Sequence, residues 1–302
     1  MPLNELAERV DRLAARVDAI ETFLNPACPH AKAGQPAARP WKLDEAPLQD
    51  LVDALFTAAK ADPLAALSFE QPDTADYLAA HARNVARLAM LIAREYGFSE
   101  ASVRTIGLCG LLHDAGMESL PPAMLEAGRP LTPEEFGQVR RHPLHGADYI
   151  RENYCFGGLL DSVIPMAVEQ HHERSDGSGY PNGLAAGGIH DFARVLSVAD
   201  SFEAMTVPRA FRRPQHPAHA MRSLLLQGYR GAGEGMYDRR VLRAFVWAAS
   251  LYPLGCEVGL SDGRRARVAA ATGDPKRPMV KTEGTDGEIL DLTEHAAIAI
   301  LN

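Results

Sequence analysis

The stretch Val103-Arg-Thr-Ile-Gly-Leu-Cys-Gly-Leu-Leu-His113-Asp114 is apolar, apart from Arg104 and Thr105, until its last two residues, which are both ionisable. An apolar run of this length predicts a buried helix. A buried charge is costly unless it is paired or bound to a metal ion. Metal coordination would satisfy His113 and Asp114 together, so the stretch suggests a metal-binding helix end.

The dipeptide alone is weak evidence, because the chain contains it twice. His190-Asp191 lies in a glycine-rich segment with no apolar helix before it. Taken singly, either pair is more often structural than part of a metal site. Only partners elsewhere in the chain can distinguish the two pairs.

Such partners exist. His81 lies on the apolar face of a predicted helix, although a lone histidine there is more often a hydrogen-bonded core residue. His142 begins the segment His-Pro-Leu-His-Gly, His171 and His172 close another predicted helix, and Asp200 ends a further apolar run. Imidazole and carboxylate groups suit iron, manganese, zinc or nickel, and the lack of cysteine among them argues against a structural zinc site.

The order of these residues resembles a known family. His81, His113-Asp114 and Asp200 resemble the ligand set of HD-domain metal phosphohydrolases, and residues 171–181, His-His-Glu-Arg-Ser-Asp-Gly-Ser-Gly-Tyr-Pro, resemble the HD-GYP subfamily. The resemblance covers about residues 77–252. It implies an all-α fold, an HD-type helical bundle around two or three metal ions, often iron or manganese. It also implies hydrolysis of cyclic di-GMP to pGpG or GMP, although some members act on related cyclic dinucleotides.

The resemblance assigns a role to each candidate residue. His81, His113, Asp114 and Asp200 would surround one metal, and a second group would bind the other, consisting of His142, His171 and His172. Asp114 would bridge the two ions, and Asp114 and His113 are the candidate catalytic residues. Two such ions can share a hydroxide that attacks phosphorus, so no protein nucleophile is required. His145 does not match the motif and is expected at the surface or just behind the ligands.

Three further residues are candidates for substrate binding. By the same resemblance, Arg209 and Arg212 would contact substrate phosphates, for which a guanidinium is suited because it donates two parallel hydrogen bonds. Arg212 in a solvated basic turn is the alternative. Tyr180 belongs to the loop Gly179-Tyr180-Pro181, which in the family is linked to shaping the site and to recognition of a partner protein.

The chain departs from the family pattern at several positions. Met117 replaces a lysine found in many members, which removes a cation near the scissile phosphate. Two alternatives therefore stay open beside the cyclic di-GMP phosphodiesterase: a metal-loaded effector with negligible turnover, and a hydrolase of another dinucleotide such as cyclic GMP-AMP. Tyr77 replaces a glutamate that helps some members to hold a third metal, so a two-metal centre is expected. His190 and Glu203 depart mildly from the usual residues.

The chain divides into four predicted regions. Residues 1–24 carry apolar side chains in a 3-4-3-4 alternation, which predicts a coiled-coil helix and a homodimer; an amphipathic helix lying on its own domain is the alternative. Residues 25–45 form a Pro/Ala-rich linker, 46–253 the catalytic domain and 254–302 a small β appendage. Within the appendage, Ser261-Asp262-Gly263 between two alternating stretches predicts a hairpin.

Composition sets further limits. With 302 residues, 46% of them hydrophobic and 23% charged, the chain is expected to be globular. It has no run of eighteen apolar residues and an amphipathic, charged N-terminus, so neither a membrane span nor a signal peptide is expected. Four scattered cysteines favour free thiols and a cytoplasmic location. A net charge of −8 argues against DNA as a partner, so any phosphate ligand must be held by local cations.

Overall fold

The computed structural model describes residues 46–61, 67, 69–70, 77–121, 124, 129–209, 213–230, 235–284 and 287–301. The predicted coiled coil and linker lie outside these residues, and so does Arg212. The coiled coil, the homodimer and the role of Arg212 therefore stay predictions.

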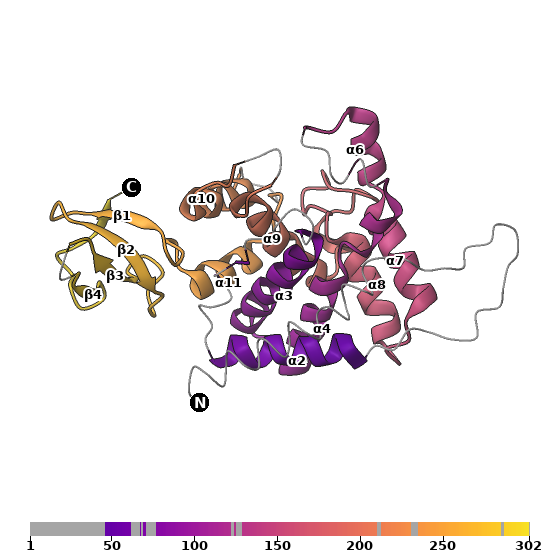
Figure 1. The fold of residues 1–302 in the computed structure, drawn as a ribbon, viewed down its shortest axis with the longest axis horizontal. Helices are drawn as coiled ribbons and strands as arrows, with labels where there is room; N and C mark the ends of the chain where they lie inside the picture. The colour runs from indigo at the N-terminus through magenta and orange to yellow at the C-terminus, as the bar shows by residue number, and fades with distance from the viewer. Residues whose placement is uncertain are drawn as a thin grey trace, which may run out of the picture.

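Helices make up the described chain as far as residue 249, and strands follow (Figure 1). The α-helices are α2 (Ala46–Ala61), α3 (Tyr77–Tyr96), α4 (Glu100–Leu112), α6 (Pro133–Val139), α7 (His142–Asn153), α8 (Leu160–Gln170), α9 (Asp191–Thr206), α10 (Pro217–Gly228) and α11 (Arg239–Ala249). Short 3₁₀ turns connect some of them, η2 (Ala115–Ser119) and η3 (Ala186–Gly188). The expected helical bundle is confirmed.

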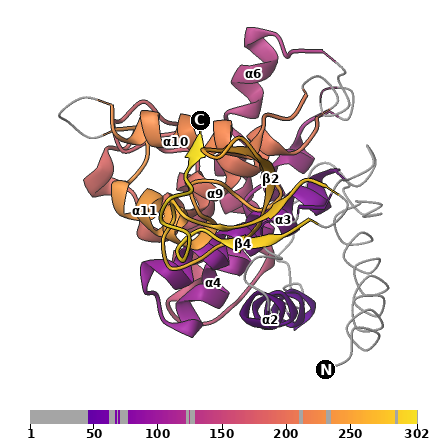
Figure 2. The ribbon, with the colours of Figure 1, turned by 90° about the vertical axis from the view of Figure 1, so that its left-hand side faces the viewer.

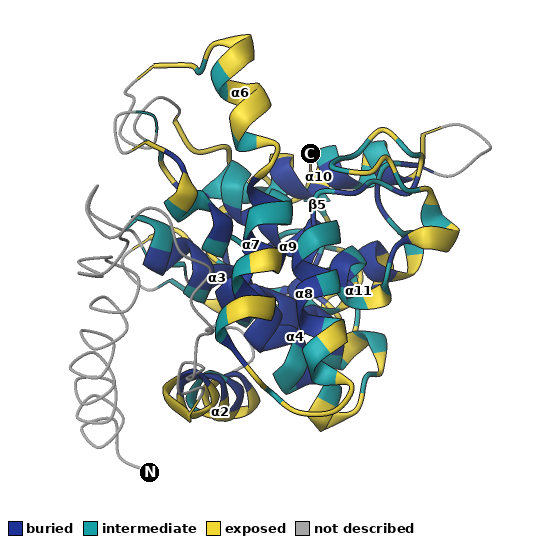
Figure 3. Cartoon of the chain, turned by 90° about the vertical axis from the view of Figure 1, so that its right-hand side faces the viewer, coloured by how far each residue is buried: buried dark blue, intermediate teal, exposed yellow. Residues whose placement is uncertain are grey.

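Helix α3 occupies the centre of the bundle. It packs against α4, α9, α11 and α2, and Figure 3 shows its neighbourhood buried while the outer faces of α2 and α6 are exposed. Its core side chains include Val85, Leu88 and Ile92, all completely buried. These residues follow the three- and four-residue spacing of a helix face, with His81 one turn earlier on that face. The central helix thus carries His81 into the middle of the bundle.

The apolar residues of α11 do not all face the core. Val241 and Phe245 are buried, but Trp247 is 46% exposed. Two residues along a helix correspond to a rotation of about 200°, so Trp247 cannot share the face of Phe245. Trp247 therefore lies on the outer face of the helix.

The last strands form a single antiparallel sheet beside α10 and α11 (Figures 1 and 2). Its order is β4-β3-β2-β1-β5, with β1 (Glu257–Leu260), β2 (Arg265–Ala270), β3 (Met279–Thr282), β4 (Ile289–Asp291) and β5 (Ile300–Leu301). The predicted hairpin joins β1 to β2, with Val258 opposite Ala266. Strand β5, which returns to pair with β1, was not predicted.

The sheet has a small hydrophobic core of its own, formed by Cys256, Leu260, Ala266, Val268, Val280, Leu290 and Leu292. Tyr252 and Ala218 pack against it from the helical part. The backbone N–H of Leu251 and the hydroxyl of Ser250 both donate to the carbonyl of Pro275, so hydrogen bonds also link the two parts.

Two sequence expectations can be compared with the described residues. None of their helices combines the length and the apolar character needed to cross a bilayer. The cysteines among them, Cys109, Cys155 and Cys256, are all free thiols.

Candidate metal centre

Five elements deliver the predicted metal ligands to one place. His81 comes from α3, His113 and Asp114 follow the last residue of α4, and the others come from α7, α8 and α9 as His142, His171, His172 and Asp200. Each of these side chains is buried or half-buried. Seven residues from distant parts of the sequence therefore lie together inside the bundle.

Helix ends fix the direction of three of the imidazoles. His113 and His171 directly follow α4 and α8, and their Nδ1 atoms lie 2.8 Å from the carbonyl of Gly110 and 2.6 Å from that of Val168. His142, at the start of α7, makes the equivalent contact with the Val139 carbonyl at 2.8 Å. A carbonyl oxygen only accepts hydrogen bonds, so Nδ1 must carry the proton and Nε2 has a free lone pair.

A glycine allows η2 to approach α7 closely. A Cβ atom built on Gly116 would lie 2.0 Å from the carbonyl oxygen of His142 and 2.5 Å from the amide nitrogen of Gly146. Both contacts are far shorter than van der Waals distance and both involve backbone. Only glycine fits here, and the close approach brings the turn that follows Asp114 against the helix that carries His142.

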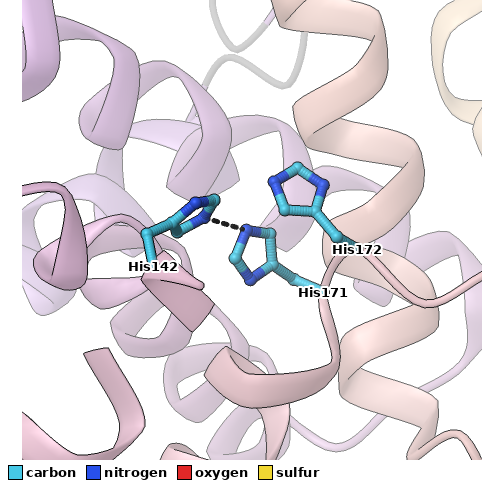
Figure 4. Close-up of side chains that lie close together, drawn as sticks. All are labelled: His142, His171 and His172. Atoms are coloured by element: carbon cyan, nitrogen blue, oxygen red, sulfur yellow. Dashed lines mark hydrogen bonds between the residues drawn. The ribbon is translucent and has the colours of Figure 1, made fainter. Parts of the chain in front are cut away.

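The histidines form two groups. In one, the ligand atoms of His81, His113 and Asp114 all lie within 4.8 Å of one another; in the other, the same holds for His142, His171 and His172. Figure 4 shows the second group, with the rings of His142 and His171 facing each other. Each group offers three donors that could hold one metal ion.

Both aspartates lie between the groups. Asp114 Oδ2 is 3.5 Å from His81 Nε2, while its Oδ1 is 3.1 Å from His142 Nε2. Asp200 is similar, because Oδ1 lies 3.4 Å from His81 Nε2 and Oδ2 lies 3.8 Å from His172 Nδ1. The position of Asp114 fits the bridge that the sequence predicted. Asp200, predicted for the first metal alone, also faces the second group.

The Nε2 atoms of four histidines face each other in pairs. His81 Nε2 and His113 Nε2 are 3.2 Å apart, and so are His142 Nε2 and His171 Nε2. The Nδ1 of His81 faces a carboxylate oxygen of Glu203 at 2.6 Å, so its proton also belongs on Nδ1. With Nδ1 already protonated, two neutral imidazoles would point their Nε2 lone pairs at one another, which is unfavourable unless a second proton or a metal ion lies between them. The donor set therefore fits metal ions.

The surrounding charges favour metal-binding protonation states. Burial raises the pKa of Asp114, but the neighbouring His113 and His142 lower it more, so the carboxyl stays ionised. Asp200 behaves in the same way next to His81 and His172. Burial lowers the pKa of His171 well below its usual value and that of His172 to about 3, which keeps both rings neutral. Ionised carboxylates and neutral imidazoles are the forms that coordinate metals.

His81 and His142 differ from the other two rings. Burial lowers the pKa of His81, yet hydrogen bonds to Asp200 and Glu203 raise it to about 10. For His142 the contact with Asp114 similarly outweighs burial and raises the pKa. Each of these rings attracts positive charge, which a metal ion would supply in place of a proton.

Glu203 and Asn84 are site residues that the sequence reasoning missed. Glu203 is completely buried one helical turn after Asp200, and it accepts from His81 Nδ1 and, at 3.0 Å, from the side-chain amide of Asn84. Such a carboxylate orients a ligating imidazole and raises its basicity. The signal in the sequence was spacing: Glu203 follows Asp200 by three residues, and Asn84 follows His81 by three.

The loop after α8 is ordered by Glu173. The buried Glu173 carboxylate accepts from the backbone N–H groups of Asn182 at 2.7 Å and Leu184 at 2.9 Å. Gly179 lies so close to this turn that a Cβ would be 2.4 Å from the amide nitrogen of Arg174. The folded loop brings the Tyr180 ring to 4.6 Å from the imidazole of His172, centre to centre.

The remaining predicted residues lie around the cluster. Arg209 extends over the ring of Tyr77 at 5.4 Å, and Tyr77 stacks on His81 with ring centres 5.7 Å apart. The Nε of Arg209 is buried without a hydrogen-bond partner among the described residues. His145 contacts the hydroxyl of Ser119 at 2.8 Å and is in neither group, consistent with the expected position behind the ligands.

The part of the chain that carries these residues is similar to known proteins. A family model described as an HD domain matches residues 72–241, more than half of the chain. A cyclic di-GMP phosphodiesterase of Pseudomonas aeruginosa is 37% identical over 223 residues, which cover 74% of this chain and 51% of that protein. This chain thus spans about half the length of that relative.

Two other proteins are also similar. The 3'3'-cGAMP-specific phosphodiesterase 1 of Vibrio cholerae is 33% identical over 132 residues, covering 44% of this chain and 30% of that protein. The solved structure of an HDG"Y"P protein from Bdellovibrio bacteriovorus shares the fold, with a TM-score of 0.51 at 20% identity, covering 65% of this chain and 60% of that one. The chain belongs to the HD domain family and is an HD-GYP protein.

Proposed function

We propose that the protein is a metal-dependent phosphodiesterase that hydrolyses cyclic di-GMP to pGpG, to GMP, or to both. The observation that carries the proposal is the arrangement of Nε2 atoms: four of them face one another in pairs around the carboxylates of Asp114 and Asp200. The name of the Pseudomonas aeruginosa relative supports cyclic di-GMP as the substrate.

The proposed ligands are those expected from the sequence. His81, His113 and Asp114 would hold one ion, His142, His171 and His172 the other, and Asp114 would bridge them, with Asp200 contributing between the two groups. Imidazole and carboxylate donors suit iron or manganese. Two such ions would acidify a water molecule and stabilise negative charge on the phosphate oxygens.

The protein's own residues would orient and neutralise the substrate. Glu203 holds the His81 ring in place, and backbone carbonyls hold three other rings, so the donors are oriented before a substrate arrives. Arg209 lies beside the cluster with an unsatisfied Nε, which suits an anionic phosphate oxygen. Tyr180, against His172, would border the bound nucleotide.

The test is turnover of cyclic di-GMP by protein purified without oxygen. Iron and manganese are quantified on the same sample, and the products are separated by chromatography. We expect pGpG or GMP to form in proportion to metal content. A sample with two metals per chain and no product would contradict the proposal.

A second candidate activity is hydrolysis of cyclic GMP-AMP. It is favoured by Met117, which leaves the cluster without the lysine expected there, and by the name of the Vibrio cholerae relative. Kinetics on both cyclic dinucleotides would decide between them. If both bind to the metal-loaded protein and neither is hydrolysed, the protein is a binding effector instead.

We further propose a cytoplasmic homodimer that forms through residues 1–24, with the Gly179-Tyr180-Pro181 loop as a site for a partner protein. The apolar 3-4-3-4 alternation of residues 1–24 supports the dimer. Removal of these residues should convert dimers to monomers in light scattering. A dimer that persists would contradict this role.

A further inference from the structure

Two tyrosines flank the metal cluster, and the ring of each contacts an arginine. On one side Tyr77 stacks on His81 and Arg209 lies over Tyr77. On the other side Tyr180 lies against His172, and the guanidinium of Arg140 is 5.0 Å from the centre of the Tyr180 ring. Each metal group therefore has its own aromatic neighbour and its own cation.

Arg140 is held close to the cluster by two elements. It directly follows α6 and stands two residues before His142, so the chain that brings His142 into the site also brings Arg140 to its edge. The contact with Tyr180 fixes the position of the guanidinium, since a cation is attracted to the face of an aromatic ring. Unlike Arg209, which is half-buried, Arg140 is exposed.

Arg140 has free hydrogen-bond donors. Among the residues that the structure describes, its guanidinium has no acidic partner and no hydrogen-bond acceptor. The other arginine near the Tyr180 loop, Arg174, is different, because it donates to the carbonyls of His171 and Glu173 and to the hydroxyl of Ser201. Arg174 therefore has a structural role, whereas Arg140 is available to a ligand.

We propose that Arg140 is a substrate-binding residue that contacts the phosphate of the cyclic dinucleotide that is not being cleaved. The inference rests on the proposed function. A cyclic dinucleotide has two phosphodiesters on opposite sides of one ring, so when one lies at the metal cluster the other lies away from it. Arg140, exposed at the edge beyond Tyr180, is placed for that second phosphate, while Arg209 is placed beside the cluster.

The position also bears on the missing lysine. Met117 supplies no charge, and the protein as a whole is acidic at −8. Beyond the charge of the metal ions, binding of a ligand with two negative charges then draws on the arginines that border the site. Arg140 and Arg209 place one cation on each flank, and a guanidinium can donate two parallel hydrogen bonds to a phosphate.

The experiment compares two substrates in Arg140→Gln. Cyclic di-GMP has two phosphates, whereas bis(p-nitrophenyl) phosphate has only one, the phosphate that is cleaved. For cyclic di-GMP we expect KM to rise about 10-fold or more, because charge-assisted hydrogen bonds are lost, with little change in kcat. Turnover of bis(p-nitrophenyl) phosphate and metal content should stay the same. Arg140→Lys should restore part of the affinity.

Arg141→Gln is the matched control. Arg141 is the neighbouring exposed arginine, and its side chain does not lie over Tyr180. It should leave KM for cyclic di-GMP unchanged. The inference is overturned if Arg140→Gln has the wild-type KM, or if it impairs both substrates equally, which would indicate a structural role.

These outcomes are separate from failure of the proposed function. If the wild-type protein hydrolyses cyclic di-GMP and Arg140→Gln is indistinguishable from it, only the role of Arg140 fails. If the metal-loaded wild type does not hydrolyse cyclic di-GMP, the proposed function fails. The dissociation constant of cyclic di-GMP, measured by calorimetry on both proteins, then replaces KM; equal constants, or no binding to either, overturn the role of Arg140.

Discussion

His113-Asp114 and His190-Asp191 have the same two side chains, yet their surroundings differ in almost every respect. His113 is completely buried after a helix, and its Nε2 faces His81, from a helix more than thirty residues earlier. His190 is half-buried before a helix, and its ring accepts from the N–H of Phe192, two residues away. The first pair has partners from remote elements, while the ring of the second has a local partner. Whether a His-Asp pair can form a metal site therefore depends on its remote partners and not on the dipeptide itself.

The largest expected effect comes from matched substitutions in the two aspartates. Asp114→Asn removes the charge that faces both histidine groups, so the metal content should fall. Activity should drop by more than roughly 100-fold, because loss of a residue that only orients a metal ligand already costs about 10- to 100-fold. Asp191→Asn should change neither. Metal analysis and turnover of cyclic di-GMP measure both effects. If Asp114→Asn keeps its metals and its rate, the two His-Asp pairs do not differ in function as argued.

Part of the site could be predicted from the sequence. The seven candidate ligands could be identified because their motifs and their order along the chain can be read from the sequence. The contacts of Asp200 with both histidine groups could not be predicted, because they depend on how α9 packs against α3 and α8. Glu203 was noted only as a departure from the family, although it lies at helical spacing from Asp200.

The fold was predictable where one face of an element is apolar. Helix α3 and the β1–β2 hairpin follow from their periodicity and from an Asp-Gly turn, and α4 follows from its apolar run. Strand β5 has only two residues, and its pairing with β1 depends on a chain segment about forty residues away. Such a contact leaves no local pattern in the sequence.

Glu203 is another remote partner of the site, separated from His81 by 122 residues. Glu203→Gln keeps the shape of the side chain but loses the negative charge that supports the imidazole. We expect metal affinity or activity to fall by about 10- to 100-fold. Titration with manganese measures the affinity, and Glu95→Gln, an exposed position on α3, is the control. Equal affinities in both variants would contradict the assigned role.

His190 should matter for stability and not for catalysis. Its ring Nδ1 lies 3.2 Å from the N–H of Phe192 and caps the first turn of α9. His190→Ala removes this acceptor and should lower the free energy of unfolding by about 1 kcal/mol or less. Urea denaturation measures the change, while kcat for cyclic di-GMP should stay at the wild-type value. A loss of activity without a loss of stability would give His190 an unexpected role in the site.

The smallest expected effect is a pH dependence at the same position. Burial lowers the pKa of His190, with opposing effects from Asp191 and Arg194, so the folded protein binds a proton there less readily than the unfolded chain. The contribution of His190 is therefore fully present above the unfolded pKa of about 6.5 and is lost as pH falls below that value and through the lower pKa of the folded state. His190→Asn retains a capping oxygen but cannot titrate. Between pH 7.5 and 5.5, wild-type stability should fall more than that of His190→Asn, and equal losses would show that the His190 cap does not depend on a neutral ring.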